Sequence, residues 1–284
     1  MSARYADALA RLYALQTRGM RFGANRMASA LALRGHPERG QRFVHVAGTN
    51  GKGSVSAMIE ASLRAAGYRT GLFTSPHLHR FVERVRISGR PIGDAEASAR
   101  VRDVLAASAA WGEPESTFFE LTTLLALESF RDHRCDVVVL ETGIGGRLDA
   151  TNAIVPEVSV ITTIALEHTE ILGSTHAAIA REKAGILKVG VPAVVGVREP
   201  SARRVIARRA RAQGAPLALI DRDFAPLVSA SARAGRFAVR VREQVIDGLR
   251  LALPGAHQQD NAACAVAAML QLRERGFDVS DAAL

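Results

Sequence analysis

Short apolar runs rich in β-branched residues alternate with helical segments along most of the chain. CDVVVLET (135–142) is a continuous apolar run of the kind found in strands buried on both faces of a sheet, and EVSVITTI (157–164) repeats that pattern. Strands that alternate with helices of this length predict an α/β fold with a doubly wound, mostly parallel sheet. The expected strands are 42–48, 68–74, 135–142, 157–164, 191–196 and 216–220, and the expected helices are 4–18, 24–34, 54–66, 94–109, 118–132, 174–187, 200–212 and 257–276.

The stretch from 234 to 253 differs from the rest of the chain. It alternates with a period of two residues and has turn residues near its middle, which predicts a small antiparallel β region within 216–253. We expect a helical N-terminal segment (1–40), a nucleotide-binding α/β domain (41–276) and the start of a further domain (277–284). Ser174 is the expected N-cap of the helix over 174–187.

Composition bounds the class of protein. Apolar residues make up 48% of the 284 residues, which is enough for a full-sized core, and no apolar run approaches the ~20 residues of a membrane span. Two distant cysteines, Cys135 and Cys264, fit a reducing cytoplasm. The net charge of +9 is compatible with nucleic-acid binding, with a simple arginine bias, or with attraction of anionic small molecules. No basic run is interleaved with aromatics, so we expect no binding to nucleic acid. We also expect a cytoplasmic protein without membrane binding, and a monomer.

The strongest local signal is HVAGTNGKGSVSAM (45–58), between a predicted strand and a predicted helix. Glycine amides and a helix N-terminus there can surround a phosphate, a lysine can neutralise it, and a serine hydroxyl can bind Mg²⁺. The spacing departs from the general G-x-x-x-x-G-K-[ST] pattern, and an ordinary glycine-rich turn is the alternative. The candidate ATP-binding residues of this loop are Gly48, Thr49, Asn50, Gly51, Lys52, Gly53 and Ser54.

The loop sequence G-T-N-G-K-G-S after a strand resembles the Mur ligase superfamily. TSPHL followed by ERVRI (74–87) is similar to the folylpolyglutamate synthase/dihydrofolate synthase family rather than to peptidoglycan ligases, as is the short segment of 47 residues before Gly48. The resemblance implies an ATP-dependent ligase that joins L-glutamate to dihydropteroate or folate through an acyl phosphate. The family continues with a second, Rossmann-like domain that nothing in this chain matches. The alternatives are therefore a nucleotide-binding module without turnover, or another ligase of the superfamily.

Carboxylate, imidazole and amine groups follow further predicted strands. Glu141 comes directly after the strand 135–140, at the sheet edge where ligands bind in doubly wound folds, and its oxygens suit Mg²⁺. The resemblance assigns Ser54 and Glu141 to one Mg²⁺ and His168 to a second, and it implies that Lys183 is carbamylated and supports the second ion. A structural hydrogen-bonding histidine and a solvated lysine are the alternatives. The implied catalytic residues are Lys52, Glu141, His168 and Lys183, and Asn261 is an implied nucleotide contact. Glu167 stands where the family usually has Asp.

Four further segments resemble the pteroate site of the family: 19–26, 75–78, 116–123 and 146–150. Phe22 and Phe119 suit stacking on a flat pterin ring, although Phe118 or Phe119 can equally belong to the core. The bond between Ser75 and Pro76 is a candidate cis peptide. The implied pteroate- or folate-binding residues are Phe22, Gly23, Ala24, Ser75, Pro76, Arg84, Thr117, Phe119, Glu120, Arg147, Leu148 and Asp149.

Overall fold

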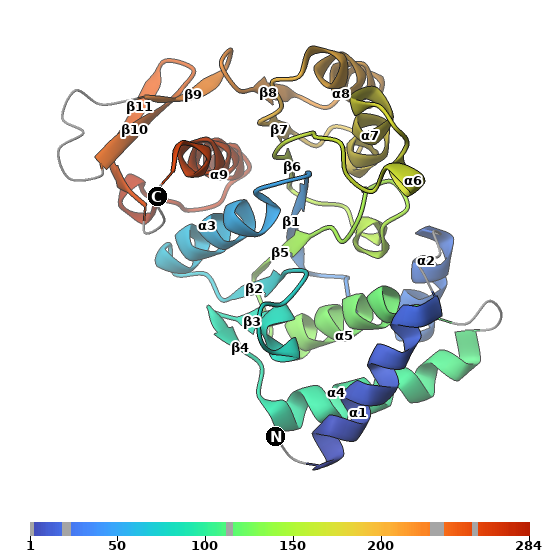
Figure 1. Cartoon of the computed structure of the whole chain (residues 1–284). Coiled ribbons are helices and arrows are strands. Elements are labelled where there is room, and N and C mark those ends of the chain that lie inside the picture. Colours follow the sequence, from blue (N-terminus) through green and yellow to red (C-terminus); the bar gives the residue numbers. More distant parts are fainter. Residues whose placement is uncertain (1–2, 19–23, 112–115, 228–235, 252–254) are drawn as a thin grey trace.

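An eight-stranded sheet runs through the centre of the computed structural model, which describes residues 3–18, 24–111, 116–227, 236–251 and 255–284. Its strands are β1 (Arg42–Ala47), β2 (Thr70–Phe73), β3 (Val85–Ile87), β4 (Arg90–Pro91), β5 (Val137–Glu141), β6 (Val158–Ile161), β7 (Ala193–Val195) and β8 (Leu217–Leu219). They lie in the order β4-β3-β2-β5-β1-β6-β7-β8 (Figure 1). Neighbours from β2 to β8 are parallel, and β3 and β4 add an antiparallel edge. The predicted doubly wound, mostly parallel sheet is confirmed.

Alternate residues of the strands bury opposite faces of the sheet, each under its own helices. Val44 and Val46 of β1 pack on one face with α3 (Lys52–Ala65) and α9 (Ala256–Glu274). On the other face, α5 (Phe118–Asp132) covers one half of the sheet, and α7 (His176–Lys183) and α8 (Pro200–Ala212) cover the other half (Figure 1). Burial of each such valine or leucine side chain contributes about 1.5–3 kcal/mol before the entropy cost of folding.

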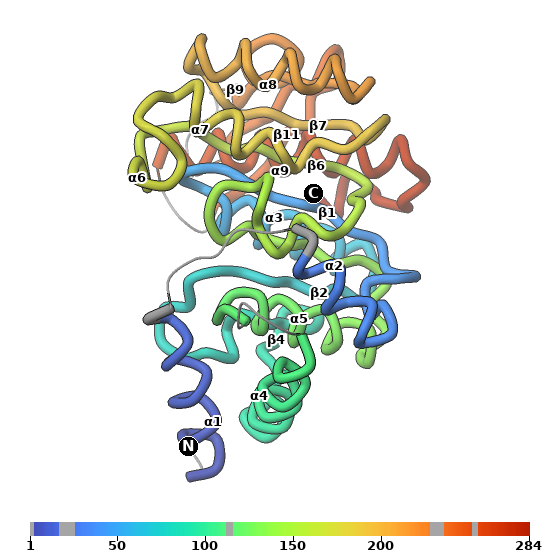
Figure 2. The backbone as a smooth tube through the Cα atoms, turned by 90° about the vertical axis from the view of Figure 1, so that its right-hand side faces the viewer, coloured from blue at the N-terminus to red at the C-terminus, as the bar shows by residue number. Residues whose placement is uncertain are grey.

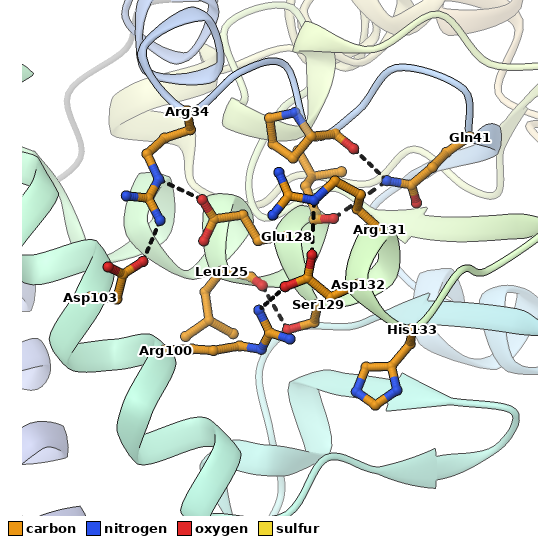
Figure 3. Close-up of polar contacts among 12 residues, drawn as sticks. Arg34, Gln41, Arg100, Asp103, Leu125, Glu128, Ser129, Arg131, Asp132 and His133 are labelled. Carbon is orange, nitrogen blue, oxygen red and sulfur yellow. Dashed lines mark hydrogen bonds and ion pairs between the residues drawn. The ribbon is translucent and has the colours of Figure 1, made fainter.

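Three further helices surround α5: α1 (Ala3–Tyr13), α2 (Ala24–Leu33) and α4 (Asp94–Ser108). Figure 2 shows α1 and α4 at the end of the molecule opposite α8. Ion pairs join this layer (Figure 3): Arg34 donates to Glu128 on α5 at 2.6 Å and also pairs with Asp103 on α4, and Arg100 contacts Asp132 at 3.0 Å. Partly exposed pairs contribute at most about 1 kcal/mol each, but together they fix α5, whose first residues line the site described below.

A second, three-stranded antiparallel sheet lies on α9. It comprises β9 (Phe224–Leu227), β10 (Arg236–Val241) and β11 (Gln244–Arg250), in the order β11-β10-β9. Phe237, Val239 and Ile246 bury its inner face in the core shared with α9. The predicted antiparallel region is confirmed, except that its first part, β8, pairs in parallel with β7 and belongs to the main sheet.

Several element ends differ from those predicted. The helix α3 begins at Lys52 rather than at residue 54, so its first turn is part of the phosphate loop. The expected N-cap Ser174 is wrong, because Thr175 has the extended backbone and its hydroxyl accepts a hydrogen bond from the amide of Ala178 at 3.1 Å. A short helix, α6 (Thr169–Leu172), was not predicted. None of the helices in the described ranges has the length and apolar character needed to cross a membrane. The domain limits, the cytoplasmic location and the monomeric state stay predictions.

Candidate active site

The loop 48–51 joins β1 to α3 and is tied to the segment that follows β6. The Thr49 amide donates to the Thr163 carbonyl at 2.9 Å, and the Asn50 amide donates to the Thr163 hydroxyl at 2.9 Å. The Thr162 hydroxyl donates to the Asn50 carbonyl at 2.6 Å. Two neighbouring strands of the parallel sheet therefore hold the loop in one conformation at their carboxyl ends, where such folds bind ligands.

Two glycines of the loop occupy positions that a side chain could not. The φ angles of Gly48 and Gly51 are 152° and 84°. A Cβ at Gly48 would lie 1.9 Å from the Thr162 Oγ1 atom, and one at Gly51 would lie 2.3 Å from the Oδ1 atom of Asn261 on α9. The predicted nucleotide contact Asn261 is thus held directly against the phosphate loop.

The first turn of α3 carries Lys52 and Ser54. The Lys52 ammonium folds over its own loop and donates to the carbonyls of Gly48 at 3.0 Å and Thr49 at 3.2 Å. Ser54 lies two residues further on, at the positive end of a 14-residue helix. A helix N-terminus and an ammonium group together have the chemistry to bind a phosphate chain.

Glu141, the last residue of β5, lies beside this turn. Its side chain is buried, and one carboxylate oxygen accepts a hydrogen bond from the Ser75 amide at 3.0 Å. Burial raises the pKa of Glu141 to about 7, against the opposing effects of the Ser75 amide, Lys52 and Arg84. A Cβ placed on Gly53 would lie 3.7 Å from the carboxylate, so Glu141 faces the start of α3.

The chemistry of this corner fits Mg²⁺. Within the described part of the chain no three His, Cys, Asp or Glu residues form a metal-binding group. Mg²⁺ is nevertheless commonly held by one carboxylate and a hydroxyl together with nucleotide phosphates and water. Glu141 and Ser54 have the oxygen atoms for such a pair of ligands, and a cation there would neutralise a carboxylate that is costly to bury.

The free-energy cost of burying the charged form of Glu141 predicts the effect of Glu141→Gln on stability. Because the pKa of Glu141 is raised on folding, the stability it provides is complete below pH ~4.5 and is lost as pH rises through ~7. In metal-free buffer at about pH 8, Glu141→Gln should therefore raise the free energy of unfolding by roughly 2–3 kcal/mol. Denaturant titrations at about pH 8 and pH 4 check this, and the difference should vanish at the lower pH. A destabilised variant at pH 8 would contradict it. Mg²⁺-dependent nucleotide binding should weaken in the same variant.

Lys183, at the end of α7, reaches the other side of the loop. The residue is 1% exposed, and its Nζ atom donates to the Gly48 carbonyl at 2.7 Å and to the Glu167 carboxylate at 2.8 Å. Burial lowers the pKa of Lys183, while Glu167 opposes the shift. His168 is exposed, has a left-handed backbone (φ 46°) and starts α6, beside Glu167. The loop, Lys183, Glu167 and His168 therefore meet at one edge of the sheet.

A cavity of about 790 Å³ opens from this point and extends to α5. Lys52, Glu167 and His168 line its end at the phosphate loop. Eight of the predicted acceptor-site residues also line it, namely Ser75, Pro76, Arg84, Thr117, Phe119, Glu120, Leu148 and Asp149. The Ser75–Pro76 peptide bond is cis, as anticipated. Phe118 lies mainly in the core, where it stacks on Tyr13 with ring centroids 5.7 Å apart, while Phe119 is more exposed.

Arg84 places a buried positive charge at the wall of this cavity. Its side chain is buried, and no carboxylate pairs with it among the residues that the structure describes. Its Nε atom donates to His77 Nδ1 at 2.8 Å, and the guanidinium carbon lies 5.1 Å from the centre of the Phe118 ring. Burial lowers the pKa of Arg84, and the negative charge of Glu141 opposes that shift. A buried guanidinium without a carboxylate partner has the chemistry to bind an anionic group of a ligand.

The remaining predicted acceptor residues lie elsewhere or are not described. Arg147 points away from the cavity and pairs with Glu182 on α7 at 3.1 Å. Phe22 and Gly23 lie outside the described residues, and Ala24 is the first residue of α2, with its side chain not described. The cavity is also lined by Phe118 and Ala150, which lie within the predicted segments, and by residues outside those segments: Leu15, Gln16, Gly143, Ile144 and Ile171. Ile144 lies within the GIGG segment after Glu141, which is the signal that could have found it.

Comparison with known proteins identifies the family of the chain. The sequence model of the Mur ligase middle domain matches residues 46–269, so the fold and the site define a phosphate-loop domain of the Mur ligase type. The chain is 39% identical to the dihydrofolate synthase/folylpolyglutamate synthase of Bacillus subtilis, over 100% of this chain and 67% of the relative. It is 40% identical to the folylpolyglutamate synthase of Lacticaseibacillus casei, over 85% and 58%. The chain belongs to the dihydrofolate synthase/folylpolyglutamate synthase family.

Solved structures of that family superpose on the chain. The apo form of L. casei FPGS matches with a TM-score of 0.91 at 35% identity, over 98% of this chain and 70% of that one. A structure described as an FPGS-AMPPCP-folate complex matches with a TM-score of 0.89 at 36% identity, over the same shares. The chain thus spans about two thirds of the length of these proteins, and somewhat more than half of the L. casei sequence relative.

Proposed function

We propose that the protein binds Mg-ATP at the Gly48–Ser54 loop and serves an ATP-dependent ligase that joins L-glutamate to dihydropteroate or a folate. The observation that carries this proposal is the single cavity that runs from Lys52 to the aromatic residues of α5. A nucleotide phosphate at one end and a flat, carboxylate-bearing acceptor at the other would meet beside Glu141 and Arg84. The names of the similar proteins, including complexes with AMPPCP and with folate, support the same pair of ligands.

The reaction would proceed in two steps. An oxygen of the acceptor carboxylate attacks the γ-phosphorus of ATP, the bond to the bridging oxygen breaks, and ADP leaves with that electron pair. The amine of glutamate then attacks the acyl carbon, loses a proton, and the tetrahedral intermediate expels phosphate to leave an amide. Lys52 and the N-terminus of α3 would stabilise the phosphate charge. Mg²⁺ held by Ser54 and Glu141 would supply charge neutralisation on the phosphates.

The proposal also includes a second Mg²⁺ and a carbamate on Lys183. Addition of CO₂ to the neutral amine of Lys183 releases a proton and turns a cation into a carboxylate-like anion. Burial, which lowers the pKa of Lys183, supports access to that neutral amine. The resulting anion and His168 would hold the second ion, with Glu167 released from its ion pair with Lys183.

Arg84 should strengthen binding of the acceptor and have no effect on binding of the nucleotide. Replacing it with glutamine would remove the buried positive charge that faces the acceptor end of the cavity. We expect the KM for dihydropteroate or folate to rise by about 10–100-fold, because charge-assisted hydrogen bonds are each worth about 1.5–3 kcal/mol. Steady-state kinetics with each substrate varied in turn check this. Arg147→Gln is the matched control, since that arginine lies outside the cavity. An unchanged acceptor KM in Arg84→Gln would remove Arg84 from the site.

The proposed function has a direct test. The chain is mixed with Mg-ATP, glutamate and either dihydropteroate or folate, and phosphate release and the new amide are measured. Formation of both products supports the ligase. Nucleotide binding without product favours the alternative of a nucleotide-binding module, and turnover only with other acids in a substrate panel indicates a different ligase of the superfamily.

A further inference from the structure

A histidine lies inside the central strand of the sheet, with no part of it exposed. His45 of β1 shares a sheet face with Phe43 and Ala47, which belong to apolar clusters, and β5 and β6 flank it. Burial lowers the pKa of His45 to about 3, helped by the positive charge of Lys188, so the imidazole is neutral at physiological pH. A polar ring at such a position costs free energy unless its hydrogen bonds are made.

Only one nitrogen of the ring has a partner. The Nε2 atom lies 2.8 Å from the Thr151 hydroxyl, whereas Nδ1 is buried and has no hydrogen-bond partner in the described part of the chain. An unsatisfied buried acceptor costs about 1–3 kcal/mol, which an apolar residue of similar size would avoid. The histidine therefore breaks a local rule of core packing, and such positions often serve function.

Thr151 links His45 to Asp149 through its hydroxyl group. The Thr151 hydroxyl lies 2.5 Å from Asp149 Oδ1, which also accepts from the Thr151 amide at 3.0 Å. The other carboxylate oxygen accepts from the amides of Gly143 at 2.9 Å and Ile144 at 3.1 Å. Four donors surround an acceptor-only carboxylate, so the threonine proton is directed to Asp149 and the hydroxyl oxygen accepts the proton of His45 Nε2.

The far end of this chain of hydrogen bonds is a wall of the acceptor cavity. Gly143, Ile144 and Asp149 all line it, and Gly143 follows Glu141 by two residues. The ring of Phe119 lies against Gly143, where a Cβ would approach it to 2.6 Å. A shift of the 143–149 turn would therefore displace the surface against which the acceptor ring packs, while the phosphate loop would keep its own anchors on Thr162 and Thr163.

We propose that His45 is a positioning residue for the acceptor: through Thr151 and Asp149 it holds the Gly143–Ile144 wall in the conformation that binds a pteridine-linked carboxylate. This inference rests on the proposed function. It predicts that loss of the imidazole donor lowers the affinity for the acceptor and leaves the affinity for the nucleotide unchanged. It also predicts a fixed tautomer, with the proton on Nε2.

The test measures binding of pteroate and of Mg-ATP to the chain by calorimetry, without turnover. His45→Leu should weaken pteroate binding by about 10-fold, which is the size of one lost buried hydrogen bond. The affinity for Mg-ATP should change by less than about twofold. His45→Gln, whose amide nitrogen can replace the Nε2 donor, should restore most of the affinity. Thr151→Val removes the hydroxyl at nearly constant side-chain volume. Its loss of pteroate affinity should equal that of His45→Leu. The double variant should lose no more pteroate affinity than either single variant, because both substitutions break the same chain of hydrogen bonds.

Ser159→Ala is the matched control, since Ser159 is a buried polar residue paired with His45 across β1 and β6, and its hydroxyl donates to the Ile186 carbonyl rather than to the Asp149 turn. Pteroate binding should be unchanged in that variant. Nitrogen-15 NMR of the wild-type chain should report the Nε2–H tautomer at neutral pH. Equal pteroate affinity of wild type, His45→Leu and Thr151→Val, or equal losses for both ligands, would overturn the inference. Failure of the wild-type chain to bind pteroate would instead count against the proposed acceptor.

Discussion

Lys183→Ala is expected to lower the rate of glutamate ligation by about 10³-fold or more, the scale seen when a group that stabilises transition-state charge is removed. The Nζ atom is almost completely buried and lies 2.7 Å from the Gly48 carbonyl, so the substitution removes a group that lies directly against the phosphate loop. Added formate or acetate should partly restore the rate, because a small carboxylate can enter the space left by a carbamylated lysine. Initial rates with and without the added carboxylate check both statements.

Lys183→Arg separates the carbamate from a simple cation. The guanidinium keeps a positive charge near Gly48 and Glu167 but does not add CO₂, since it stays protonated. We expect this variant to remain inactive and to gain nothing from added carboxylates. Carbon-13 NMR of the wild type in labelled bicarbonate should reveal a carbamate signal that both variants lack. Undiminished activity of Lys183→Ala would reject any catalytic role, and an active Lys183→Arg would reject the carbamate.

Local sequence was enough for the parts of the site that lie in one segment or at one strand end. The phosphate loop is contiguous from Gly48 to Ser54, and its place between a strand and a helix follows from periodicity. Glu141 could be placed near it because the carboxyl ends of parallel strands meet at one sheet edge. The resemblance added Lys183 and Asn261, which come from two other helices, and the structure brings both to the loop.

Contacts that depend on side-chain direction could not be read from the sequence. Arg147 belongs to a matching segment, but Gly185 packs so tightly that a Cβ there would lie 2.3 Å from the Arg147 Cα atom, and the arginine turns outward to Glu182. The ion pair of Lys183 with Glu167 depends on the turn at His168. The hairpin strands β3 and β4 were missed because three and two residues, respectively, are too few to show a period.

The glycine geometry of the loop supports a second large effect, for Gly51→Ala. Its φ of 84° costs a residue with a Cβ about 1–2 kcal/mol, and the added atom would lie 2.3 Å from Asn261 Oδ1. Both the loop and Asn261 must then move, and the amides that face the phosphates move with them. We expect the affinity for Mg-ATP to fall by about 100-fold, equivalent to about 2.7 kcal/mol, with the fold retained.

Gly67→Ala distinguishes damage to the loop from backbone strain alone. Gly67 follows the other end of the same helix with a φ of 92°, and among the described residues no heavy atom beyond its own and those of its two chain neighbours lies within 4 Å of the position of its Cβ. The two variants should therefore lose comparable backbone stability in thermal denaturation, while only Gly51→Ala loses nucleotide in calorimetric titration with Mg-ATP. Wild-type nucleotide affinity in Gly51→Ala would mean that the phosphates bind elsewhere, because in the observed loop conformation the added carbon displaces Asn261.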